Sequence, residues 1–167
     1  FSSTPDCFRK ISYEKITKIS RRTNRLFHRK KGCVCLISTI LLPIYNMANL
    51  SQLILGETGC VSYIVYCNDK KEGAIVDAFE GYESNIEKEL ERIGDISIKY
   101  VMDTHTHADR KSSSSYFSNK YKTEGIVKSS LTKYKGDLIQ TNDNDIFKIG
   151  NSEIRVMFTP GHTYDHN

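Results

Sequence analysis

Alternating apolar and polar side chains mark the first elements that the sequence predicts. Residues 50–55 and 60–67 are predicted strands; residues 60–67 are rich in β-branched and aromatic side chains and alternate with the period of two that a half-buried strand shows. The intervening Gly-Glu-Thr-Gly at 56–59 has the composition of a hairpin turn. After a polar turn, the apolar run 74–78 predicts a short buried strand, so three strands are expected to form a meander.

A helical period replaces this alternation further along the chain. Between residues 82 and 93 apolar side chains recur at spacings of four and three on a charged background that ends at Gly94. Alternation returns at 96–102 and predicts another strand. A strand, a helix and a strand in this order form a βαβ unit, whose functional loops lie at the carboxyl ends of the strands. The apolar helical positions are Ile86, Leu90 and Ile93.

The remaining pattern predicts one more helix and several short strands. The serine-rich segment 111–121 is expected to contain a helix that places Tyr116 and Phe117 in the core rather than at a substrate site. Elements of both kinds, in this order, indicate an α/β domain. The expected strands are 125–127, 146–149 and 154–158.

The net charge of the chain changes sign at Met47. Residues 1–46 hold ten basic and two acidic residues, a net charge of +8, whereas the remainder holds 14 basic and 18 acidic residues, a net charge of −4. The overall charge of +4 therefore belongs to the leading segment. Since the domain at 47–167 has no basic excess, we expect no nucleic-acid partner.

The leading segment 1–46 is basic and contains an apolar run at 34–45. This run is shorter than the roughly 20 residues that a helix needs to cross a bilayer, so no membrane span is expected. The composition fits a disordered or non-native extension, a targeting segment or a structural part of the protein. We expect the first, with a cytoplasmic location, and the mitochondrial matrix if residues 1–46 are a transit peptide.

The five cysteines are odd in number and form no CxxC pair, so they indicate neither a disulfide framework nor a zinc ribbon. A reducing compartment is expected. Cys60 and Cys67 lie in an apolar stretch and are expected to pack as small hydrophobic side chains. The others are Cys7, Cys33 and Cys35, and the last two lack a second pair with which to bind a metal.

His105, His107 and Asp109 directly follow the strand predicted at 96–102. In an extended segment, side chains at a spacing of two point to the same side. Imidazole is the commonest metal ligand because one ring nitrogen keeps its lone pair near neutral pH, and a nearby carboxylate can orient the ring. The cluster is typical of the first part of a metal site, although two histidines at this spacing also occur by chance.

His162 is a second and independent cue. It follows Pro160 and Gly161 at the end of the strand predicted at 154–158. Pro and Gly shape exposed turns that can present one side chain to a cleft. With two strand ends that carry histidines, we predict His105, His107 and His162 as metal ligands.

The stretch Thr-His-Thr-His-Ala-Asp at 104–109, together with Thr-Pro-Gly-His-Thr at 159–163, resembles the signature of the metallo-β-lactamase superfamily. That signature is HxHxDH, followed far downstream by a His after a Gly. The motifs are most similar to those of the persulfide dioxygenase and glyoxalase II branch, and the similarity runs from about Leu50 to Asn167. The resemblance implies an α/β fold, a four-layer αββα sandwich, of which residues 47–167 would be the first half and therefore C-terminally incomplete.

The resemblance also implies roles for single residues. His105 and His162 match ligands of the first metal, and His107 matches a further ligand in sites of the hydrolase type. Asp109 matches an aspartate of the second zinc site in dinuclear hydrolases. The next position, a His in the signature, is Arg110 here, and a guanidinium cannot coordinate a cation. One metal ion per site is therefore expected.

A single ion held by two histidines and one carboxylate is the facial triad of non-haem Fe(II) oxygenases. The resemblance thus favours a persulfide dioxygenase-like oxidation of a glutathione-type persulfide at one Fe(II). A small-molecule thiol or persulfide is the expected partner, and homo-oligomerisation stays open. The alternatives are a glyoxalase II-like thioester hydrolase with zinc, and an inactive fragment that keeps part of the fold.

The carboxylate ligand of the family would lie well beyond His162 and past Asn167. Asp165 and His166 match loop positions of the family rather than its ligands. Without a carboxylate the cage lacks an anion that offsets the charge of the cation, so weak metal binding and no activity are expected of this chain.

Other polar residues carry weaker signals. Asp77 and Asp103 end predicted strands, where they either support the histidines or are solvated in loops. Ser112 to Ser115 are not surrounded by a Gly-x-Ser-x-Gly elbow, so a place at a helix start or on the surface is expected rather than a nucleophile.

Overall fold

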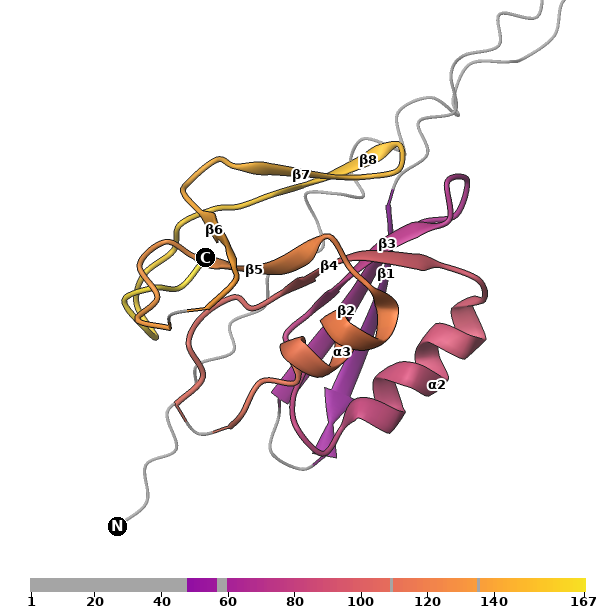
Figure 1. The fold of residues 1–167 in the computed structure, drawn as a ribbon, viewed down its shortest axis with the longest axis horizontal. Coiled ribbons are helices and arrows are strands. Elements are labelled where there is room, and N and C mark those ends of the chain that lie inside the picture. Colours follow the sequence, from indigo (N-terminus) through magenta and orange to yellow (C-terminus); the bar gives the residue numbers. More distant parts are fainter. Residues whose placement is uncertain (1–47, 57–59, 109, 135) are drawn as a thin grey trace, which may run out of the picture. The chain divides into compact units, whose positions relative to one another are not determined.

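The structure, a computed structural model, describes residues 48–167 apart from 57–59, 109 and 135, so the predictions for residues 1–46 lie outside the described residues. Six strands form the central sheet in the order β1-β2-β3-β4-β5-β6 (Figure 1). The strands are β1 (Asn49–Leu55), β2 (Cys60–Cys67), β3 (Glu72–Val76), β4 (Ser97–Met102), β5 (Gly125–Ser129) and β6 (Ile139–Thr141). β1, β2 and β3 are antiparallel, which confirms the predicted meander, and β3 to β6 run parallel.

Two helices, α2 (Glu83–Ile93) and α3 (Ser114–Tyr121), accompany the sheet (Figure 1). α2 connects the parallel strands β3 and β4, which confirms the predicted βαβ unit. Its apolar stripe faces the sheet, because Ile86 and Leu90 are buried while the charged positions between them are exposed or half-buried. The largest completely buried side chains of this core are Ile64, Ile75, Ile86, Val101 and Phe117.

A second apolar cluster packs with the hairpin β7 (Ile146–Ile149) and β8 (Ser152–Arg155). Cys67 belongs to this cluster and is buried, as predicted, whereas Cys60 is half-buried. On β1 the alternation puts Leu53 against the helix-side core, so Leu50 and Ile54 point to the other face of the sheet. These two side chains are 53% and 71% exposed, so the described residues leave part of that face uncovered.

Three local predictions differ from the structure. The last strand ends at Arg155 rather than extending over 154–158, because Val156 leaves the hairpin and exchanges backbone hydrogen bonds with Asn144 and Asp145. The three-residue β6 was not predicted, since its alternation is too short to recognise. Tyr116 is exposed and donates a hydrogen bond to Glu87 on α2, so its predicted place in the core is wrong.

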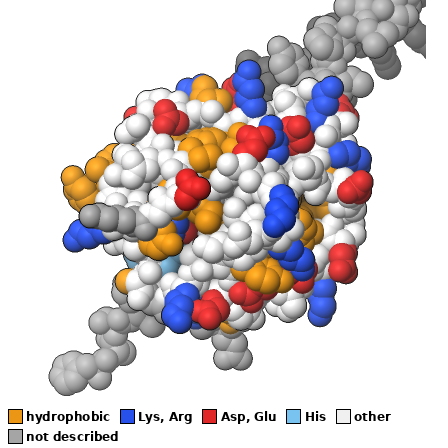
Figure 2. Space-filling view, in the orientation of Figure 1, with side chains coloured by type: hydrophobic (Ala, Val, Ile, Leu, Met, Phe, Trp, Pro, Cys, Tyr) orange, Lys and Arg blue, Asp and Glu red, His pale blue; other side chains and the backbone are white. Residues whose placement is uncertain are grey.

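The surface in Figure 2 carries Lys, Arg, Asp and Glu side chains interspersed with one another, and neither sign of charge forms a continuous patch on the face that is drawn. Within the part of the chain that the structure describes, no helix has the length and hydrophobicity needed to cross a membrane.

Candidate metal centre

The candidate centre lies where β3 and β4 end. Asp77 follows β3 and Asp103 follows β4, and because these strands are parallel, both carboxylates emerge at the same edge of the sheet. Asp77 adopts a left-handed backbone conformation with φ 56°, which Asp tolerates better than most residues. Both side chains are almost completely buried, which excludes the alternative that they are merely solvated in loops.

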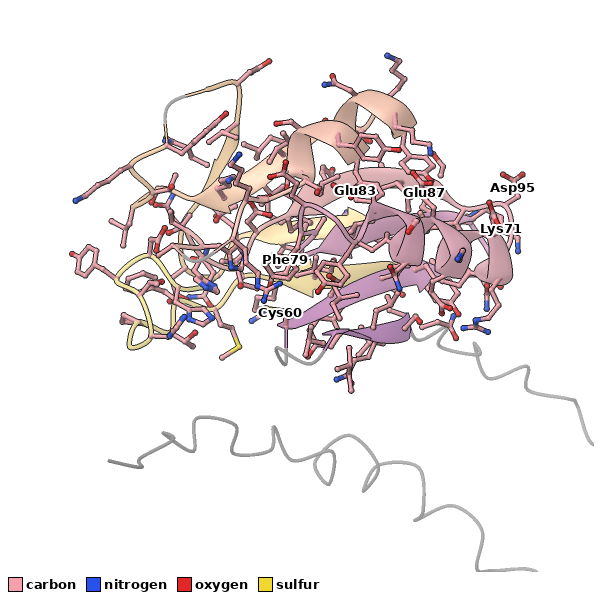
Figure 3. The ribbon with its side chains drawn as sticks, turned by 90° about the horizontal axis from the view of Figure 1, so that it is seen from below. Cys60, Lys71, Phe79, Glu83, Glu87 and Asp95 are labelled. Atoms are coloured by element: carbon pink, nitrogen blue, oxygen red, sulfur yellow. The ribbon has the colours of Figure 1, made fainter. Side chains whose placement is uncertain are left out.

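Asp77 organises the loop that carries the first two histidines. Its Oδ1 accepts a hydrogen bond from the backbone N–H of Thr104 and its Oδ2 accepts one from the Thr104 hydroxyl, both at 2.8 Å. Nε2 of His107 lies 3.3 Å from Asp77 Oδ1. The ring of His107 also packs edge-on against Phe79 with centroids 4.7 Å apart. Figure 3 labels Phe79 among the side chains of the domain. These contacts fix the loop backbone and one imidazole ring.

The same hydrogen bonds decide which ring nitrogen of each histidine can bind a metal. A carboxylate only accepts hydrogen bonds, so His107 carries its proton on Nε2 toward Asp77 and keeps a lone pair on Nδ1. The Thr104 hydroxyl uses its proton on Asp77, so it accepts at 2.9 Å from Nδ1 of His105. His105 therefore keeps its lone pair on Nε2.

A second loop brings His162 to the first two histidines. It follows β8 and is pinned to the first loop by Asp165, whose Oδ2 accepts hydrogen bonds from the backbone N–H and the hydroxyl of Thr106. Burial by itself raises the pKa of Asp165, but the hydrogen bonds that its carboxylate accepts, above all from Thr106, outweigh it and hold the pKa below its ordinary value. Asp165 is thus a charged anchor between the loops.

All four histidines of the described residues gather at this place. The ring centroid of His105 lies 4.1 Å from that of His107 and 5.0 Å from that of His162. Two imidazoles on one tetrahedral ion, with metal to nitrogen distances of about 2.0–2.1 Å, have centroids roughly 5 Å apart. The structure therefore places the ring of His105 next to those of His107 and His162, with His162 exposed and the other two half-buried, and their binding of a shared metal ion stays a prediction. The fourth histidine is His166.

A different group of potential ligands lies beside the histidines. Asp77, Asp103 and His107 offer ligand atoms within 4.8 Å of one another and could hold a metal ion. However, Asp103 Oδ2 forms an ion pair with the Lys128 ammonium at 2.7 Å, and its Oδ1 accepts hydrogen bonds from the hydroxyls of Ser112 and Ser114. Since Lys128 already supplies a positive charge beside Asp103, we infer that Asp77 and Asp103 do not bind the metal ion and instead position the residues around it.

Burial lowers the pKa of His105 below its ordinary value of 6.5, and the neighbouring His107 lowers it further. Below about pH 6.5 the folded protein therefore binds fewer protons than the unfolded chain. The contribution of His105 to the free energy of unfolding is fully present above about pH 6.5 and is lost as the pH falls through the pKa that His105 has in the folded protein. We expect the free energy of unfolding, measured in urea with a chelator present, to fall below pH 6.5 and the substitution His105→Gln to flatten that fall. An identical pH profile for the variant would contradict this expectation.

A cleft of about 350 Å³ opens on one side of His107. Lys128 and Arg110 line it, together with side chains from the start of α3 and from the segment before β6. Arg110 stands next to Asp109, which lies outside the described residues. The cleft could receive a polar molecule beside the histidines.

Comparison with known proteins finds similar sequences and similar folds. No protein-family model matches the chain. The chain is 27% identical over 134 residues to a beta-lactamase hydrolase-like protein of Xylella fastidiosa, covering 64% of this chain and 31% of that protein. It is 33% identical over 110 residues to a probable hydroxyacylglutathione hydrolase of Schizosaccharomyces pombe, covering 62% and 40%.

Solved structures show the same fold. ETHE1 from Myxococcus xanthus matches with a TM-score of 0.63 and 22% identity, over 71% of this chain and 51% of that one. A metallo-β-lactamase from Staphylococcus aureus has the same TM-score with 25% identity, over 72% and 37%. The chain thus resembles proteins of the metallo-β-lactamase superfamily in sequence and fold. Its described residues form a partial α/β metallo-β-lactamase fold, which confirms the predicted fold class, and the chain spans 26% to 40% of the length of the curated relatives it matches.

Several residues of this candidate site were not identified from the sequence. Thr104 and Thr106 alternate with the histidines, and their contacts depend on Asp77 and Asp165 from distant segments. Lys128 lies on β5 with no local signal that it pairs with a buried aspartate. The alternation of Thr and His at 104–107 could have indicated that the threonines point away from the ligands.

Proposed function

We propose that the chain carries the histidine part of a mononuclear Fe(II) centre that oxidises the terminal sulfur of a glutathione-type persulfide. The observation that supports it most is the convergence of His105, His107 and His162 where Arg110 replaces the His of the second metal site. An Arg side chain cannot coordinate a cation, so the donors favour one ion. A bound Fe(II) would supply coordination positions for the persulfide and O₂.

The chain's own residues would hold and orient this centre. Thr104 and Asp77 fix the two half-buried imidazoles so that a free nitrogen of each is available, as second partners of metal-bound histidines do. The cleft beside His107, which Arg110 and Lys128 line, would bind the thiol carrier. In the overall reaction a persulfide, O₂ and water give the thiol and sulfite, so the terminal sulfur is oxidised and O₂ is reduced.

A glyoxalase II-like hydrolase is the second candidate. It is favoured by the similarity to the probable hydroxyacylglutathione hydrolase, at 33% identity. In that case zinc would replace iron and would supply a nucleophile for the hydrolysis of a glutathione thioester. The same histidines would hold the ion, and the same cleft would hold the glutathione moiety.

Metal content and O₂ consumption distinguish the two candidates. A form of the protein extended past Asn167, so that it includes the carboxylate ligand of the family, is loaded anaerobically with Fe(II) or with Zn(II), and O₂ uptake on glutathione persulfide is compared with hydrolysis of a glutathione thioester. We expect O₂ uptake with iron, equimolar sulfite, and no thioester hydrolysis with either metal. Thioester hydrolysis with zinc and no O₂ uptake would replace the proposal by the second candidate.

The substitution His105→Ala is expected to abolish O₂ uptake, because it removes the ligand at the centre of the histidine group. Gln140→Ala, at an exposed position of β6 that does not line the cleft, is the matched control and should retain the activity of the unaltered chain. Absence of both activities from the unaltered chain would leave only the third alternative, a chain that keeps the fold without catalysis.

A further inference from the structure

We propose that a second cleft, next to the one beside His107, holds the γ-glutamyl end of the glutathione-type carrier. This inference deepens the proposed function and rests on its substrate, but it concerns residues that lie away from the histidines. The second cleft has a volume of about 380 Å³. It lies between α3, the start of β5 and the segment before β6.

The two clefts meet over β5. From their common part the first cleft extends to Lys128 and His107, and the second extends to Glu124, just before the strand. Ile126 and Lys128 are two residues apart on β5, so their side chains point to the same face and form a common floor. A molecule held beside His107 can therefore continue along β5 into the second cleft. The side chains that line both clefts are Ser115, Ile126, Tyr134 and Leu138.

The length of this floor matches the size of the carrier. Successive residues of a strand are about 3.3 Å apart along its axis, so Glu124 and Lys128 are separated by about 13 Å. An extended tripeptide spans about 10–11 Å. With its sulfur beside His107, a carrier of this length reaches past Ile126, and its far end lies in the second cleft.

Small polar side chains of α3 keep the second cleft open. Ser115, Ser118 and Asn119 line it, whereas Phe117 of the same helix is completely buried in the core. The hydroxyls of Ser118 and Thr123 lie 2.8 Å apart, and this hydrogen bond holds the end of the helix near the start of β5. The serine-rich sequence of α3 thus leaves space for a ligand above the strand.

The side chains of the second cleft suit a zwitterion, and the γ-glutamyl end of the carrier bears an ammonium and a carboxylate. The carboxylate of Asp137 can accept hydrogen bonds from the ammonium, and the amide of Asn119 can donate to the carboxylate. Glu124 is already paired with the Lys99 ammonium at 2.9 Å and the Tyr100 hydroxyl at 2.7 Å. None of the described residues that line this cleft is basic, which favours the amino-bearing end of the carrier.

Binding of stable thioethers to the full chain tests the second cleft without metal and without turnover. S-methylglutathione is compared with S-methylcysteinylglycine, which lacks the γ-glutamyl end, by isothermal titration calorimetry. We expect S-methylglutathione to bind about 10-fold more tightly, as one or two hydrogen bonds would give. Ser118→Trp, which fills the second cleft, should abolish this preference. Gln140→Trp, at an exposed position of β6 that lines neither cleft, should keep it.

The outcomes separate this inference from the proposed function, which O₂ uptake by the extended form tests independently. If Ser118→Trp keeps the preference, or if the unaltered chain shows none, the γ-glutamyl end does not occupy the second cleft and the inference is overturned. Should Ser118→Trp fail to fold, as judged by circular dichroism, amide NMR shifts of the unaltered chain decide. Shifts at residues 123–126 that only S-methylglutathione causes support the inference, and shifts confined to residues around His107 overturn it.

Discussion

Replacing Lys128 by Met is expected to lower the free energy of unfolding by about 3 to 5 kcal/mol. The Lys128 side chain is 15% exposed and its ammonium lies 2.7 Å from Oδ2 of Asp103, whose side chain is 1% exposed. Removal of the cation leaves a buried carboxylate with only the hydroxyls of Ser112 and Ser114 as donors. Desolvation of that charge is not compensated, so the folded state loses stability. Urea unfolding followed by circular dichroism measures the change.

The double substitution Asp103→Asn with Lys128→Met is the informative control. It removes both charges while keeping similar side-chain volumes, and buried ion pairs replaced in this way often cost little stability. We expect the double variant to be more stable than Lys128→Met alone, which would show coupling between the two positions. If the losses of unfolding free energy in Asp103→Asn and Lys128→Met add up to the loss in the double variant, the ion pair does not cause the instability of Lys128→Met.

The second large effect is expected for Asp77→Ala. The free energy of unfolding should fall by about 2 to 4 kcal/mol, because two hydrogen bonds from Thr104 lose their acceptor and Ala tolerates the left-handed backbone less well than Asp. His107 loses its orienting carboxylate at the same time. Metal affinity should therefore fall 10- to 100-fold. Chemical denaturation and a Co²⁺ titration measure the two quantities.

The substitution Asp77→Asn separates the role of Asp77 in stability from its role in orienting His107. Asn also tolerates the left-handed conformation, and its amide oxygen can still accept the N–H of Thr104. We expect less than half of the stability loss of Asp77→Ala, but a clear loss of metal affinity, because a neutral amide orients the His107 ring less strongly. Equal affinities for the Asn variant and the unaltered chain would contradict the orienting role of the charge.

The sequence predicted those features that depend on local periodicity. Alternation identified β2 and β4, the helical spacing identified α2, and the order of these elements gave the βαβ unit. The three residues of β6 and the end of β8 at Arg155 were not predicted correctly, since pairing with Asn144 and Asp145 decides where the chain leaves the hairpin. Boundaries of this kind depend on contacts between distant segments.

In the candidate site too, some residues could be predicted from the local sequence and others depend on contacts between distant segments. Strand ends followed by histidines indicated His105 and His162, and the structure brings their rings within 5.0 Å. The place of His166 was predicted to be an ordinary loop position, because its approach to His105 requires two loops to dock. No local pattern encodes that docking. The metal itself and the oxidation of a persulfide stay predictions that the experiments above test.

The two loops that carry the histidines are joined by the chain that forms α3, the last strands of the sheet and the β7–β8 hairpin. An ion shared by His105 and His162 would close this long loop as a cross-link does, and the entropy lost by the unfolded chain would add to the stability of the fold. The melting temperature would then rise with the concentration of free metal. Metal supply and protein lifetime would become linked, so that a cell starved of the ion would lose the protein as well as its activity.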